Sequence, residues 1–187
     1  MARVEPHHRH PLHSTAAVLE AALKNLGGLK GKTGKAPKTN NAAELRPIIV
    51  YGLSDTKAAA QAALEQGGQE LAMLSPTGVA HSLGPQWFKE LVANTESMFS
   101  DLRIIGILDC GPYEGHVMNA LHSGLKHVYF TGEDESAEKL NWIAAKTGAF
   151  IYREFDEVLD LKGEGDQLAA CREWFRTGRS PSTKRTA

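Results

Sequence analysis

The sequence predicts an α/β fold, a three-layer sandwich built on a five-stranded, mainly parallel sheet. Three observations support this prediction. From residue 47 onward, short apolar runs rich in β-branched residues alternate with helical patterns, most links between them are short, and glycines follow several of the expected helices. A helix that joins two such strands returns the chain to the same edge of the sheet, so this alternation is typical of parallel pairing.

Each expected element has a local justification. The strands are expected at residues 48–53, 70–75, 103–109, 127–131 and 149–153, and the helices that follow them at 54–66, 86–100, 115–123, 136–147 and 166–176. The first strand is a continuous apolar run, as in strands that are covered on both faces. Ser54 suits the N-cap of the first helix, Asp55 suits the positive end of its dipole, and Pro85 suits the first turn of the second helix. The third strand is apolar from Ile104 until it reaches Asp109.

Two strand arrangements fit five strand–helix units. A flavodoxin-like sheet of order 2-1-3-4-5 uses all five units and is preferred, whereas a complete TIM barrel needs eight. The alternative is therefore a partial, TIM-like array of strand–helix units, either truncated or closed by another chain. No Gly-x-Gly-x-x-Gly motif follows the first strand, so dinucleotide binding has no support, and the sequence identifies no cofactor.

The composition divides the chain into three parts. The expected α/β domain covers residues 47–176, and it follows a basic, flexible segment at 1–46 that contains a short helix at about 14–26. A basic, disordered tail is expected at 177–187. The short helix carries leucines at helical spacing, and we expect this stripe to pack on the domain, on a protein partner or on a second copy, which makes a homo-oligomer possible. The stripe consists of Leu19, Leu23 and Leu26.

Several partner classes find little support. The basic ends lack the aromatic residues that stack on bases, since none lies in residues 1–46, and this argues against nucleic-acid binding. The histidines near the N-terminus are expected to bind metals only adventitiously; they are His7, His8, His10 and His13. No apolar run is long enough to span a membrane or to act as a secretory signal, so the cytoplasm is the expected location.

A ligand site in either arrangement is expected where the carboxyl ends of the strands meet. The candidate binding residues are Ser75, Thr77, His81, Asp109, Thr131 and Glu133. Asp109 is the sharpest candidate: its carboxylate is suited to bind a metal, accept a proton or receive a phosphoryl group, or else it simply caps its own Asp-Cys-Gly-Pro turn. Cys110 is either a nucleophile paired with His116 or, more often for such a position, a packed apolar side chain.

The long link at residues 75–84 supports a ligand loop, because small hydroxyl residues and glycines expose backbone amides that can hold an anion. Each candidate set of catalytic residues in the sequence lacks at least one residue that the chemistry needs. The preferred interpretation is therefore a non-catalytic accessory or regulatory domain that binds a protein partner or self-associates. The alternative is a domain that binds a small anionic metabolite, or an enzyme, with its site at the strand ends.

Overall fold

A computed structural model describes residues 45–178 of the chain. The strands are β1 (Ile48–Ile49), β2 (Glu70–Leu74), β3 (Arg103–Asp109), β4 (His127–Tyr129), β5 (Phe150–Tyr152) and β6 (Leu159–Asp160). The helices are α2 (Leu53–Glu65), α3 (Val79–Ser82), α4 (Gly84–Met98), α5 (Glu114–His122), α6 (Asp134–Thr147) and α7 (Gln167–Thr177). The helix predicted at 14–26, its leucine stripe, the N-terminal histidines and the tail beyond residue 178 lie outside the described residues. The predicted boundary at residue 47 therefore stays a prediction.

The predicted α/β class is confirmed, and all strand pairs are parallel. The sheet has six strands rather than five, in the order β5-β4-β3-β2-β1-β6. The preferred flavodoxin-like order is wrong, because it would pair the first strand with the third, whereas here β2 pairs with β3. The order from β1 to β5 is instead consecutive, as in the alternative array of strand–helix units.

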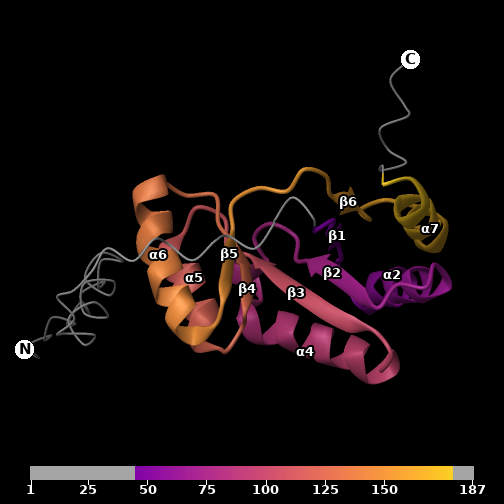
Figure 1. Cartoon of the computed structure of the whole chain (residues 1–187), viewed down its shortest axis with the longest axis horizontal. Coiled ribbons are helices and arrows are strands. Elements are labelled where there is room, and N and C mark those ends of the chain that lie inside the picture. Colours follow the sequence, from indigo (N-terminus) through magenta and orange to yellow (C-terminus); the bar gives the residue numbers. More distant parts are fainter. Residues whose placement is uncertain (1–44, 179–187) are drawn as a thin grey trace, which may run out of the picture. The chain divides into compact units, whose positions relative to one another are not determined.

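The consecutive order places the helices on one face of the sheet. Right-handed crossovers that always advance in the same direction put their helices on the same side. Accordingly, α2 contacts α4, α4 contacts α5, and α5 contacts α6, while α7 packs beside α2. Figure 1 shows these helices following one another along the sheet. α4 approaches the sheet closely at Gly106 of β3, where a Cβ atom would stand 2.5 Å from Cγ2 of Val92.

The opposite face of the sheet carries a smaller apolar cluster, which we call the inner cluster. Its buried members are Ala72, Leu74, Ile105, Ile107 and Tyr152. In the described residues this cluster is covered by Leu45 and by the link between β5 and β6, which contributes Phe155 and Val158. The three layers are therefore the helices, the sheet and this link with its flanking residues.

The β5–β6 link crosses the sheet with little slack. From Tyr152 to Leu159 an extended chain reaches at most about 23–25 Å. In a flat sheet the link would cross five strand spacings, about 24 Å, and descend three residues along the strands, about 10 Å, because Leu159 aligns through β1 and β2 with Gly106. At right angles these two displacements combine to about 26 Å, so the link needs nearly its full extended length to cross the inner cluster.

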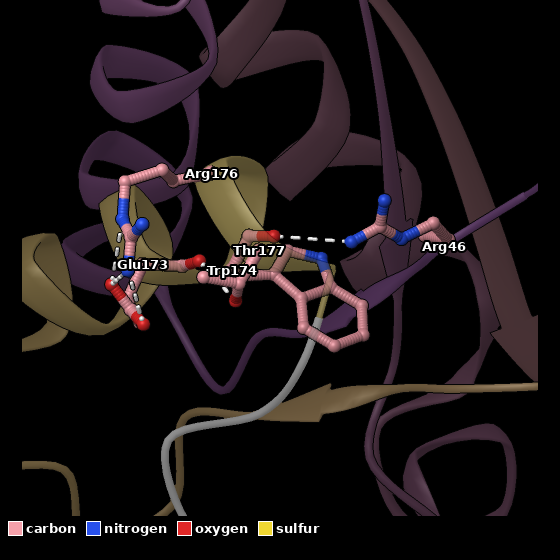
Figure 2. A network of polar contacts seen from close by, with 5 residues as sticks. All are labelled: Arg46, Glu173, Trp174, Arg176 and Thr177. Atoms are coloured by element: carbon pink, nitrogen blue, oxygen red, sulfur yellow. Dashed lines mark hydrogen bonds and ion pairs between the residues drawn. The ribbon is translucent and has the colours of Figure 1, made fainter.

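The end of α7 is tied to the residues that precede β1. Trp174 is 1% exposed, and its carbonyl oxygen accepts a hydrogen bond of 3.1 Å from Nη2 of Arg46. The Arg46 guanidinium also lies 5.0 Å from the centre of the indole ring, a cation–π contact. Figure 2 shows this arrangement beside the Glu173–Arg176 ion pair, whose atoms are 2.7 Å apart. These contacts fix the C-terminal helix against the start of the sheet.

Two further differences from the expected elements have physical causes. β1 ends at Ile49 rather than near residue 53, because Val50, Tyr51 and Gly52 form the link to α2, which begins at Leu53. β6 contains only Leu159–Asp160 and lies within an acidic stretch, where two residues cannot produce a strand pattern. No helix of the described residues is long and apolar enough to cross a membrane.

Candidate functional site

A cavity of about 510 Å³ opens at the carboxyl ends of β2 and β3. We call it the strand-end cavity. Its lining residues are Thr77, Gly78, Ala80, His81, Asp109, Cys110, Gly111, Pro112, Tyr113 and His116. Both the location and the volume are typical of small-molecule sites in parallel α/β folds. Two loops build the wall, one after each strand.

Asp109 is one of the lining residues and is 6% exposed. Its Oδ2 accepts a hydrogen bond of 2.8 Å from the Thr77 hydroxyl, and its Oδ1 accepts one of 2.8 Å from the backbone N–H of Gly111. The second bond is the turn cap that the sequence offered as the simple explanation of Asp109. The first bond goes further, because it joins the β2 loop to the end of β3.

The loop after β2 brings two predicted residues to the cavity. Gly78 has a φ of 88°, a left-handed conformation that favours glycine, and it leads into the short helix α3. That turn places Thr77 beside Asp109 and His81 on the cavity wall. Ser75 is fully buried and does not line the cavity, but its hydroxyl accepts a 2.9 Å hydrogen bond from the Asp109 N–H. Ser75 therefore positions Asp109 instead of contacting a ligand.

The loop after β3 supplies the remaining wall. Cys110 is 1% exposed, and burial together with the Asp109 charge raises the pKa of its thiol to about 12. This thiol stays protonated at neutral pH, which favours the packed side chain over the nucleophile. Tyr113 and His116 also line the cavity and were not among the predicted binding residues.

Three aromatic rings form a continuous row along this wall. The centre of the Tyr113 ring lies 5.0 Å from that of His116, at an angle of 60°. The His116 ring in turn lies 5.8 Å from that of His81, at an angle of 43°. The row thus connects the β3 loop and α5 with α3, and all three of its residues line the cavity.

Two predicted residues stand apart from this cavity. Thr131 follows β4 and is exposed; its N–H donates a 3.0 Å hydrogen bond to the carbonyl oxygen of Gly111, so only its backbone supports the site. Glu133 is the exposed N-cap of α6. The loop after β4 packs against the β3 loop, since a Cβ on Gly132 would stand 3.0 Å from the carbonyl oxygen of Pro112, but neither Thr131 nor Glu133 lines the cavity.

A second polar network lies at the ends of β1 and β6. Asp55 is 5% exposed and accepts hydrogen bonds of 2.7 Å from the Tyr51 N–H and 2.6 Å from Nε2 of Gln167. Asp55 Oδ1 therefore joins α2 to α7 through Gln167, whereas Oδ2 binds the residue two positions before α2.

The described residues contain no group of three or more His, Cys, Asp or Glu side chains arranged to hold a metal ion. In comparisons with known proteins, no family model and no curated protein matches the chain.

Proposed function

We propose that the domain binds a small molecule in the strand-end cavity. The observation that carries this proposal is the nearly buried Asp109, which forms part of the lining of a cavity of about 510 Å³. Each oxygen of an ionised carboxylate has two acceptor positions, and each Asp109 oxygen accepts one hydrogen bond from the protein. The remaining positions are available to a donor group on a ligand.

We therefore favour small-molecule binding over the accessory or regulatory role that we preferred from the sequence alone. The helix that would serve as an interaction arm lies outside the described residues, whereas the cavity is formed entirely by them. Binding is also favoured over catalysis. No hydrogen bond joins Asp109 to either His81 or His116 in the described structure, and the buried Cys110 thiol lacks the low pKa of a nucleophile.

Thermal denaturation of the full chain with a library of small polar and aromatic compounds tests the proposal. We expect at least one compound to raise the Tm of the unmodified protein and to lose this effect in Asp109→Asn. The amide keeps the volume of the carboxylate and can still donate to the Thr77 hydroxyl, so the unliganded variant should lose only about 1–2 kcal/mol of stability.

Asp101→Asn is the matched control, because Asp101 is exposed just before the opposite end of β3. This variant should respond to the same compound as the unmodified protein. Equal stabilisation of Asp109→Asn and of the unmodified chain would contradict the proposal, and so would a library in which no compound shifts the Tm.

A further inference from the structure

The row of rings indicates the shape of the ligand. Tyr113 is 60% exposed and His81 is exposed, although both line a cavity, so their rings are available for contact with a bound molecule. Aromatic rings prefer offset-stacked or edge-to-face contacts with other rings. Because the three rings are tilted by 43° and 60°, a flat ligand that stacks on one of them meets the edge of the next.

The polar groups indicate which atoms the ligand carries. The Asp109 carboxylate only accepts hydrogen bonds, so its free positions call for N–H or O–H donors on the ligand. A neutral imidazole offers one donor and one acceptor, which allows His81 and His116 to pair with either kind of atom on a ring edge. Donors and acceptors that alternate in one plane are typical of nitrogen heterocycles.

The charged residues that line the cavity argue against a phosphate group on the ligand. Among the described lining residues there is one carboxylate and neither Lys nor Arg. The first turn of α5, which begins beside Tyr113, carries Glu114, and this acidic side chain offsets the positive end of the helix dipole. A phosphate group in the cavity would therefore meet the Asp109 charge with neither a lysine nor an arginine in the lining to neutralise it. This reasoning departs from the anionic metabolite that the sequence suggested.

We infer that the strand-end cavity takes a flat, uncharged or cationic nitrogen heterocycle with ring N–H or amino donors and without a phosphate group. The inference rests on the proposed function and adds the chemical class of the ligand. The ring stacks against the Tyr113–His116–His81 row, and one of its donors bonds to Asp109.

Titration of the full chain with matched heterocycles tests the inference. The probes are adenine, guanine and xanthine, each with N–H donors; caffeine, a xanthine whose N–H groups are methylated; and adenosine monophosphate. We expect at least one of the three bases to bind, and caffeine and the monophosphate to bind at least about tenfold more weakly than that base. Tyr113→Leu should weaken binding of the same base by about fivefold or more, since loss of base–aromatic stacking has effects of this size.

Phe150→Leu is the control for Tyr113→Leu, because it replaces another exposed ring at the start of β5, away from the cavity lining. This variant should bind the base as the unmodified protein does. Binding of caffeine or the monophosphate as tight as that of the base would overturn the inference.

The two proposals fail in distinguishable ways. If aliphatic amines or alcohols stabilise the chain in an Asp109-dependent manner while no heterocycle does, the ligand class is wrong and the proposed function stands. If neither the heterocycles nor any library compound shifts the Tm, both are wrong.

Discussion

Replacing Gly106 by alanine tests the packing of α4 on the sheet. The new Cβ would stand 2.5 Å from Cγ2 of Val92, whereas ordinary carbon contacts lie at about 3.5–4.0 Å. Val92 cannot easily turn aside, because valine strongly prefers one χ1 rotamer in a helix. Overpacking of this kind costs about 1–3 kcal/mol, and the lower entropy of the unfolded alanine chain returns about 0.4–1 kcal/mol. We expect a net loss of about 1–2 kcal/mol, or roughly 3–8 °C in Tm.

Urea unfolding followed by tryptophan fluorescence measures this loss, and a second substitution locates its cause. In the Val92→Ala background the colliding methyl group is absent, so Gly106→Ala should there be neutral or slightly stabilising. Gly165→Ala is the control, since its Cβ would meet no atom within 4 Å. A loss below about 0.5 kcal/mol for Gly106→Ala, or an equal loss with and without Val92, would refute the contact between α4 and β3 on which the one-sided helix layer depends.

Two other predictions concern the thiols and the N-terminal segment. Burial raises the pKa of Cys110 and of Cys171 to about 12. Both thiols should therefore react slowly with iodoacetamide at pH 8.5 in the folded chain and rapidly in the chain unfolded by urea. Equal reaction rates in the folded and unfolded chain would contradict the burial. Since unfolded thiols ionise near pH 9, the stability that these two groups contribute should be present below pH 9 and decline as the pH rises toward 12. Deletion of residues 1–30 should lower the mass measured by light scattering if the leucine stripe mediates self-association, and an unchanged mass would remove that role.

The fold class followed from the sequence because its signal is local. The run from Ile104 to Leu108 is apolar and β-branched enough to identify β3 without tertiary information. The strand order was not predictable in this way. Whether β3 pairs with β1 or with β2 depends on contacts between distant residues, such as Val92 against Gly106, that leave no periodic pattern in the sequence.

The site was predictable where its residues follow strands that lie side by side. Asp109 ends β3, Thr77 lies in the loop after the neighbouring β2, and the two side chains meet, while His81 reaches the same cavity through α3. Thr131 was chosen by the same rule, but it does not line the cavity, and only its backbone N–H bonds to the β3 loop. Tyr113 was missed although it lies only four residues after Asp109, because the ring row depends on how α5 is oriented rather than on where β3 ends.

The short β5–β6 link has a consequence for synthesis of the chain. β1 can pair with β2 as soon as both have left the ribosome, but its other neighbour, β6, is translated roughly 110 residues later, about 5–20 s at ordinary elongation rates. Throughout this interval the inner cluster lacks Phe155 and Val158, and the side of β1 that later receives Leu159 is an open strand edge. Until its last fifth emerges, the nascent domain thus lacks both the Phe155 and Val158 cover of this cluster and the strand that completes the edge beside β1.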